Sequence, residues 1–120
     1  IIVILATDAP LSGLSLRQLA KRAAIGIGRG GTPGGNNSGD IFLAFSTANP
    51  GPMPQPAGPL MTLQELNIDR LDPLYLAAVE AIEESVVNAM VAGVDVPTVK
   101  PAGHVCRALD TERLRKIFAG

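Results

Sequence analysis

The chain opens on an apolar segment, and a second such segment follows about forty residues later. Residues 1–6 (IIVILA) and residues 41–46 (IFLAFS) are apolar almost throughout. Short runs of this kind, without polar residues at alternate positions, are typical of strands that are buried on both faces. We therefore predict two β-strands in the interior of a sheet.

The segment between the two strands combines a helix with a flexible loop. Apolar residues recur at helical spacing after Ser15, which together with Gln18 matches a capping box. The glycines from Gly26 onward are predicted to end this helix. The small residues at 28–39 then form a loop that leads into the second strand. After that strand, residues 49–59 contain five prolines, which predicts a surface loop or an arm that contacts another subunit.

Two further helices are predicted in the second half of the chain. The pair Asp72-Pro73 combines a capping residue with a proline at the first helical position, and Gly93 is expected to end this long helix. Asp110 is the expected cap of a final helix that runs through Phe118. No internal repeat is visible, so we expect one domain that spans residues 1–120.

Two strands that are buried on both faces cannot complete a sheet by themselves. A sheet generally needs three or more strands, and each of these two needs a cover on both sides. Chain ends are usually polar and frayed, whereas this sequence starts with a core strand. We therefore expect that another polypeptide, the other half of a cleaved precursor, completes the sheet.

Composition excludes several classes of function. Hydrophobic residues make up 47% of the chain and aromatic residues only 3%, so the core is aliphatic. The net charge of −1 gives no electrostatic reason to expect binding to nucleic acid or to an anionic membrane. No apolar run reaches the roughly 18 residues of a membrane span. The single cysteine, Cys106, is compatible with a reducing compartment, and we expect a cytoplasmic location.

A glycine-rich motif invites a nucleotide-binding interpretation, but its context argues against it. Residues 26–31 match the pattern G-x-G-x-x-G. A dinucleotide-binding loop follows a strand and opens a helix, whereas here a helix precedes the glycines and a strand follows them. The sequence has no Gly-Lys-Ser/Thr triplet for a phosphate-binding loop. We expect no cofactor.

Ser38 and Asp40 form the best candidate site. They lie two residues apart at the entrance to the second strand, so in an extended segment both side chains share one face. The glycine between them lets a substrate or another backbone approach closely. A hydroxyl beside a carboxylate can relay a proton, but such a pair can also simply satisfy turn amides. His104 and Cys106 show no ligand spacing, and we expect no metal site.

Three segments together resemble a known family. They are residues 1–11 (IIVILATDAPL), residues 38–49 (SGDIFLAFSTAN) and, less specifically, residues 84–89 (ESVVNA). The chain resembles the β-chain of the L-aminopeptidase D-Ala-esterase/amidase (DmpA) family, which includes the β-peptidyl aminopeptidases. The resemblance covers nearly the whole chain.

This resemblance implies a fold and a set of site residues. The fold is an α+β, αββα sandwich of the N-terminal-nucleophile type, in which this chain is the smaller β-subunit and an α-chain completes it. The precursor cleaves itself before a Ser, which stands immediately before Ile1 and is the nucleophile. Ser38 and Asp40 match the second serine and the acidic residue of the family. Some members carry Glu at the acidic position, and Asp is one methylene shorter.

The resemblance also implies an activity, namely an aminopeptidase that hydrolyses N-terminal amino acids from peptides, amides and esters. A free α-amine has a pKa of about 7.7–8.0, so it can accept the nucleophile's proton near pH 8. Ser38 would relay that proton, and Asp40 would orient Ser38 and offset positive charge. The expected partners are the α-chain, further αβ units in a homo-oligomer, and the substrate. The oxyanion and amine-binding residues belong to the α-chain.

Two alternatives stay open. One is an acyltransferase related to ornithine acetyltransferase, which would carry Thr instead of Ser before Ile1. The other is a non-catalytic structural subunit whose glycine loop and proline arm make subunit contacts only. The sequence does not define substrate stereochemistry, the preference between α- and β-peptides, or the size of the oligomer.

Overall fold

A computed structural model describes residues 1–51, 55 and 57–119 of the chain. The chain divides into two compact units, Ile1–Glu83 and Glu84–Gly120. Part of the predicted proline arm, residues 52–54 and 56, lies outside the described residues. That residues 1–120 fold as a single domain stays a prediction.

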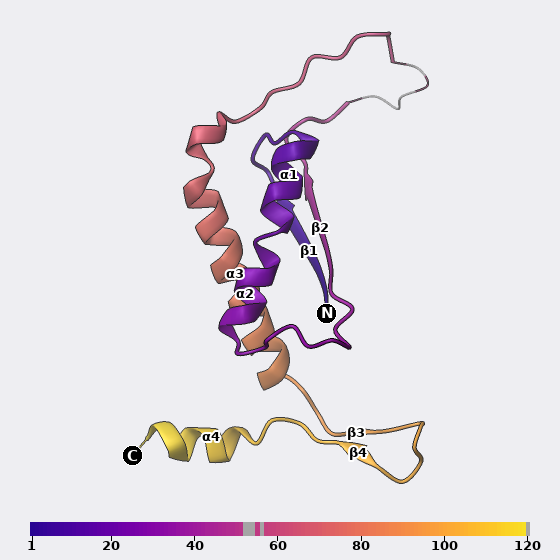
Figure 1. Cartoon of the computed structure of the whole chain (residues 1–120), viewed down its shortest axis with the longest axis vertical. Coiled ribbons are helices and arrows are strands. Elements are labelled where there is room, and N and C mark those ends of the chain that lie inside the picture. Colours follow the sequence, from indigo (N-terminus) through magenta and orange to yellow (C-terminus); the bar gives the residue numbers. More distant parts are fainter. Residues whose placement is uncertain (52–54, 56, 120) are drawn as a thin grey trace. The chain divides into compact units, whose positions relative to one another are not determined.

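The first unit is built around a pair of parallel strands. The two strands, β1 and β2, pair in register from Ile2 opposite Ile41 to Thr7 opposite Ser46, and Figure 1 shows them side by side. Both were predicted within one residue of their observed ends. The elements of this unit, in chain order, are β1 (Ile2–Thr7), α1 (Gly13–Ala20), α2 (Ala23–Arg29), β2 (Ile41–Ser46), a 3₁₀ turn (Ile68–Arg70) and the start of α3 (Asp72–Val91).

One face of the strand pair packs against the helices. Because side chains alternate along a strand, every second residue of β1 and β2 points to this face and is half-buried. These side chains contact two clusters of buried residues, which are Leu11, Leu19, Leu71 and Ala78 in one and Ala23, Ile27 and Ile82 in the other. The core of this unit therefore lies between the strands and helices α1, α2 and α3.

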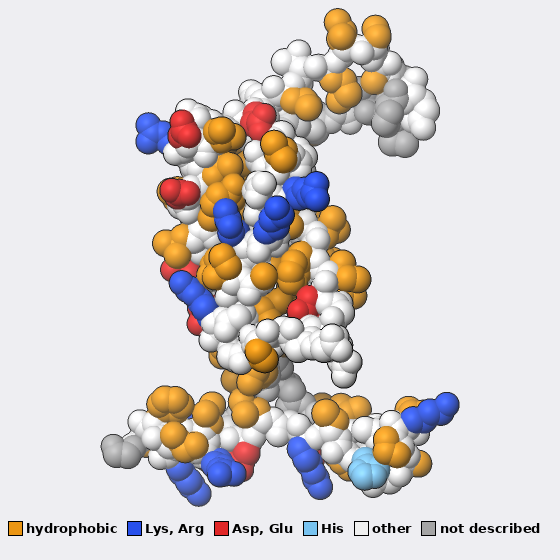
Figure 2. Space-filling view, viewed as in Figure 1, with side chains coloured by type: hydrophobic (Ala, Val, Ile, Leu, Met, Phe, Trp, Pro, Cys, Tyr) orange, Lys and Arg blue, Asp and Glu red, His pale blue; other side chains and the backbone are white. Residues whose placement is uncertain are grey.

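The opposite face of the strand pair is exposed, although it is strongly apolar. Ile2 is 72% exposed and Ile4 is 62% exposed, while Ile41 and Leu43 are exposed at 61% and 54%. Figure 2 shows hydrophobic side chains at the surface of this unit. Burial on both faces was predicted, and the described residues supply a cover for one face only. A further layer is therefore needed to bury the other.

The predicted start of the first helix is wrong by one turn. The N-cap of α1 is Ser12, whose extended backbone (φ −69°, ψ 165°) lets its hydroxyl accept a hydrogen bond from the Ser15 N–H at 3.3 Å. Ser15 lies inside the helix and is buried, and its own hydroxyl donates to Glu65 Oε1 at 3.0 Å. The capping-box pattern fits Ser15 with Gln18 and does not fit Ser12, which has Ser15 at the third position after it. The pattern failed because the Ser15 hydroxyl is used in a tertiary contact to Glu65, while Ser12 caps the helix with its hydroxyl alone.

The predicted end of that helix is also wrong. The helix breaks at Lys21 and Arg22 and resumes as α2, which continues past Gly26 to Arg29. Gly26 lies within α2 where α3 packs against it. A Cβ atom at this position would lie 2.8 Å from the Ile82 side chain and 2.9 Å from the Val79 carbonyl oxygen. The glycine therefore permits close packing of two helices instead of ending one.

Charged side chains link the first two helices to α3. The Arg22 guanidinium lies over the Tyr75 ring at 4.1 Å from its centroid. Arg29 Nη1 lies 3.1 Å from Glu83 Oε2, and Glu83 is half-buried in this ion pair. Both contacts add to the apolar packing of the same helices.

The second unit contains the end of α3, a short hairpin and a final helix. The strands β3 (Val96–Pro97) and β4 (Val105–Cys106) pair antiparallel, and Asp95 accepts hydrogen bonds from Arg107 and from the Ala108 N–H. The helix α4 (Thr111–Phe118) is capped by Asp110, as predicted, which accepts from the Arg113 N–H at 2.9 Å. None of residues 84–119 is fully buried, so this unit lacks a core of its own.

Because α3 lies close to Gly26, an alanine at this position should destabilise the protein, whereas an alanine at Gly28 should not. In the full-length protein, Gly26→Ala should lower the free energy of unfolding by about 1–2 kcal/mol, because overpacking costs about 1–3 kcal/mol and exceeds the helical gain of about 0.5–1 kcal/mol. Gly28→Ala is the matched control, because nothing lies within 4 Å of a Cβ there. Chemical denaturation measures both. Equal stability of the two variants would contradict the packing described here.

Candidate active site

The parallel pairing brings the starts of both strands to one edge of the sheet. The Ile41 N–H donates to the Ile1 carbonyl oxygen at 2.9 Å, which continues the ladder by one bond beyond the paired strands. The residues just before Ile41 therefore lie beside Ile1, as Figure 1 shows at the end marked N. The predicted candidates Ser38 and Asp40 are in this segment.

Asp40 contacts the first residue of the chain directly. Its Oδ1 atom lies 2.9 Å from the Ile1 nitrogen, which in this chain is the terminal amine, and its side chain is 24% exposed. The hydrogen bond from this nitrogen lowers the pKa of Asp40 below the ordinary aspartate value, and the side chain of Ser38, a second donor, lowers it further. Asp40 is therefore an ionised carboxylate at neutral pH.

The structure thus brings both predicted site residues to the start of β1. Asp40 hydrogen bonds to a group 39 residues away in sequence, which does not fit the alternative that it only satisfies turn amides. The Ser38 main-chain N–H does make a turn hydrogen bond, to the Gly35 carbonyl oxygen at 2.8 Å. The catalytic roles of Ser38 and Asp40 stay predictions.

The glycine-rich loop before Ser38 turns the chain back toward β1. Gly31 and Gly34 have positive φ angles of 95° and 63°, which L-residues with a side chain rarely adopt. The Gly34 N–H donates to Thr32 Oγ1 at 3.3 Å. Gly31 and Gly34 are therefore needed for the backbone conformation of this loop. The segment does not form the strand–loop–helix arrangement of a nucleotide-binding motif.

A small cavity of about 260 Å³ adjoins Asp40. It lies between α2, the glycine loop and β2, and Asp40 is its one charged lining residue among the described residues. The lining residues are Ala24, Ile27, Thr32, Pro33, Gly34, Asp40 and Phe42. The wall of the cavity on this side is mostly apolar.

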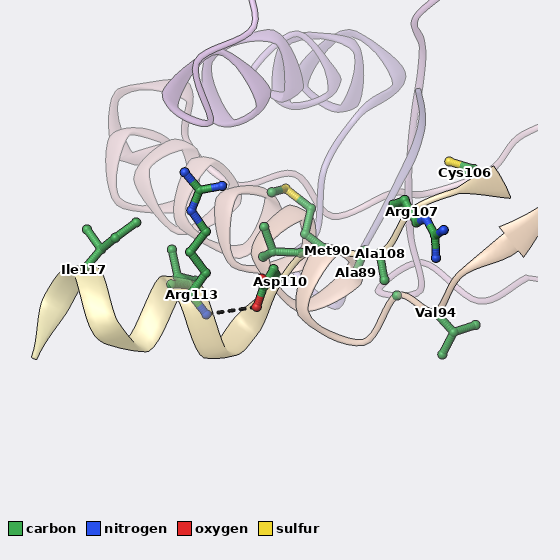
Figure 3. A pocket seen from close by; sticks show the side chains of 12 residues that line it. Ala89, Met90, Val94, Cys106, Arg107, Ala108, Asp110, Arg113 and Ile117 are labelled. Carbon is green, nitrogen blue, oxygen red and sulfur yellow. Dashed lines mark hydrogen bonds between the residues drawn. The ribbon is translucent and has the colours of Figure 1, made fainter.

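A larger groove of about 670 Å³ lies in the second unit (Figure 3). It is formed by the end of α3, the segment after β4 and helix α4, and its wall is mainly apolar. Figure 3 shows Met90 and Ile117 along the groove together with Arg113 and Asp110. Neither Ser38 nor Asp40 lines it, so we do not place the proposed chemistry there.

The remaining candidates contribute nothing to this site. His104 is exposed, and its carbonyl oxygen accepts a hydrogen bond from the Thr98 N–H at 3.0 Å within the hairpin turn. Cys106 is exposed and unpaired. In the part of the chain that the structure describes, no group of three or more His, Cys, Asp or Glu side chains is arranged to hold a metal. No described helix is both long enough and apolar enough to cross a membrane.

The sequence reasoning missed the contact between Asp40 and the Ile1 nitrogen. Finding it requires knowing that the two strands are parallel and that Ile2 pairs with Ile41. The helical segment between two strands of equal length was an available signal, because such a connection is typical of parallel strands. The exact register had no sequence signal.

Comparisons with known proteins agree with this geometry. The model of peptidase family S58 matches residues 1–104. The β-peptidyl aminopeptidase BapA of Sphingosinicella microcystinivorans is 42% identical over 118 residues, which are 98% of this chain and 29% of that protein. The solved L-aminopeptidase D-Ala-esterase/amidase of Ochrobactrum anthropi is 52% identical with a TM-score of 0.91, over 98% of this chain and 32% of that one. A β-aminopeptidase of Burkholderia sp. is 39% identical with a TM-score of 0.84, over 98% and 34% of the two chains.

These relatives settle the fold and the family. The Ochrobactrum protein is described as a variant of the N-terminal-nucleophile hydrolase fold, and the structural agreement confirms the predicted α+β fold of that type. The chain spans about 30% of the length of the relatives it matches. The family model covers most of the chain, and the sequence identities are well above what a shared fold alone would give. The chain therefore belongs to peptidase family S58.

Proposed function

We propose that this chain forms the β-subunit of an aminopeptidase whose nucleophile is a Ser joined to Ile1 and freed by self-cleavage. The observation that carries this proposal is the edge of the sheet where Ser38, Asp40 and the Ile1 nitrogen lie together. A residue attached to Ile1 emerges at this edge. It would therefore stand next to a hydroxyl and an ionised carboxylate.

The chemistry follows from the groups at this edge. A Ser hydroxyl is a weak nucleophile until a base removes its proton, and the α-amine of the same residue can act as that base after cleavage. Ser38 relays the proton, while Asp40 orients Ser38 and offsets the positive charge that develops on the amine. The nucleophile oxygen bonds to the substrate carbonyl carbon, the leaving amine or alcohol takes the proton, and water then hydrolyses the acyl-enzyme.

The proposal includes a partner, the α-chain of the same precursor. The exposed apolar face of β1 and β2 has the character of a sheet face that another layer buries. The relatives are about three times as long as this chain, so a complete protein of this family has residues to supply that layer. We also infer an oligomer of αβ units and substrates that are peptides, amides or esters.

The names of the relatives favour hydrolysis over acyl transfer. The three matched proteins described above are aminopeptidases by name. The apolar wall and ionised Asp40 do not by themselves distinguish water from an amine as the acyl acceptor. Hydrolysis is therefore the activity we propose.

Removal of the Ser38 hydroxyl should impair turnover. In the full-length precursor, Ser38→Ala is expected to lower kcat for an aminoacyl p-nitroanilide by about 10²–10⁴-fold, the usual contribution of positioned proton transfer. Asn37→Ala is the control, because Asn37 is an exposed neighbour in the same loop. Steady-state kinetics measures both. Turnover of Ser38→Ala at the level of the control would remove Ser38 from the mechanism.

The lowered pKa of Asp40 predicts a dependence of stability on pH. A carboxyl whose pKa falls on folding adds stability above its unfolded pKa, and this stability is lost as the pH falls through its folded pKa. In the full-length protein Ile1 has no terminal charge, but the Ser38 side chain still donates to Asp40 and lowers its pKa. The stability difference between this protein and Asp40→Asn should thus be constant at neutral pH and shrink below the ordinary aspartate range. Denaturation at several pH values measures it. A difference that already shrinks above that range would contradict an ionised, hydrogen-bonded Asp40.

A further inference from the structure

We propose that Asp40 positions the nucleophile by holding the main-chain N–H of Ile1 in place of a strand carbonyl. This role is separate from its action on Ser38, and it rests on the proposed function because the nucleophile is taken to be the residue joined to Ile1. Asp40 is then a positioning residue that acts on the backbone.

The ladder geometry shows why the Ile1 nitrogen points at Asp40. In a parallel pair, a residue whose C=O bonds to the neighbouring strand directs its N–H to that same strand. The Ile1 carbonyl oxygen accepts from the Ile41 N–H at 2.9 Å, so the Ile1 nitrogen also faces the segment before β2. The next main-chain acceptor in the ladder would be the carbonyl of residue 39. Asp40 Oδ1 takes this place, at 2.9 Å from the Ile1 nitrogen.

The proposal requires this contact to form without a terminal charge. In a chain with a residue before Ile1, the same nitrogen belongs to a peptide group and keeps one hydrogen in the peptide plane. The bond from the Ile41 N–H to the Ile1 carbonyl oxygen extends the parallel ladder to Ile1, so this hydrogen is directed at the segment before β2, which carries Asp40. An N–H at the end of a ladder needs an acceptor, and the carboxylate supplies it.

Holding this N–H restrains the nucleophile through a single peptide bond. The carbonyl carbon of the preceding residue lies in the same rigid plane as the Ile1 nitrogen, and its Cα is the next atom. Reacting groups must be held closely, since a displacement of about 1 Å can cost about 10²-fold in rate. The loss should fall on kcat, because the substrate can still bind.

Two variants separate the backbone contact from the carboxylate charge. Asp40→Asn keeps an oxygen that can accept from the Ile1 N–H but has no charge, whereas Asp40→Ala has neither. Each variant lacks the charge, so the difference between their kcat values measures what the Asn carboxamide, with its acceptor oxygen, contributes. We expect kcat of Asp40→Asn to exceed that of Asp40→Ala by about 10²-fold at similar KM, measured on the full-length protein with an aminoacyl p-nitroanilide.

The same two variants, compared again in a protein that also carries Ser38→Ala, show whether the oxygen at position 40 acts on the Ile1 N–H or on Ser38. The advantage of Asn over Ala at position 40 should persist there, because the Ile1 contact does not involve Ser38. An activated aminoacyl ester keeps the reaction measurable in these slow variants. Equal kcat values for Asp40→Asn and Asp40→Ala, or an advantage that disappears without Ser38, would overturn the proposal.

A structural readout distinguishes failure of this inference from failure of the proposed function. In the full-length protein labelled with ¹⁵N-isoleucine, the Ile1 amide should show a hydrogen-bonded shift in the wild type and in Asp40→Asn, and lose it in Asp40→Ala. An unchanged Ile1 signal in Asp40→Ala would reject the positioning role even in an active enzyme. If the hydrogen-bonded shift of the Ile1 amide is lost in Asp40→Ala but the wild-type protein has no peptidase activity, the proposed function is rejected and the contact between Asp40 and Ile1 is established.

Discussion

The parallel pairing of β1 with β2 is the constraint on which the site depends. Two apolar segments that lie forty residues apart reach the same edge of the sheet only because they run in the same direction, with Ile2 opposite Ile41. That register places the Ile1 nitrogen 2.9 Å from Asp40 Oδ1. A shift by one residue would turn Asp40 to the other face of the sheet and separate the two groups.

The rest of the first unit maintains this register. Residues on one face of the strands pack against α1, α2 and α3, so a slipped strand would place exposed Ile and Leu side chains against the helices and the buried set in solvent. Gly26 lets α2 approach α3 closely enough for that layer to form. The opposite face of the strands is apolar and exposed. The relatives are about three times as long as this chain, so a complete protein of the family has further residues that can cover such a face.

Local sequence signals predicted the elements better than their contacts. The strand ends, the long helix α3 and the Asp110 cap follow from apolar runs and capping residues, and all agree with the structure. The start of α1 was wrong because Ser15 and Gln18 match the capping-box pattern, whereas the Ser15 hydroxyl in fact contacts Glu65 and Ser12 caps the helix. Gly26 was taken for a helix end because its reason, contact with Ile82, is tertiary. Ser38 and Asp40 were found as a pair, whereas the Ile1 nitrogen was not, because register has no local signal.

The central claim is that a Ser joined to Ile1, freed by cleavage, reacts beside Ser38 and Asp40. Its most direct test is N-terminal sequencing of the subunits in an active preparation of the full-length protein. The account predicts a subunit that starts with Ser followed by the segment Ile1–Leu5. An active protein whose chain stays uncut at this position, or whose mature subunit starts at Ile1 itself, would contradict the account.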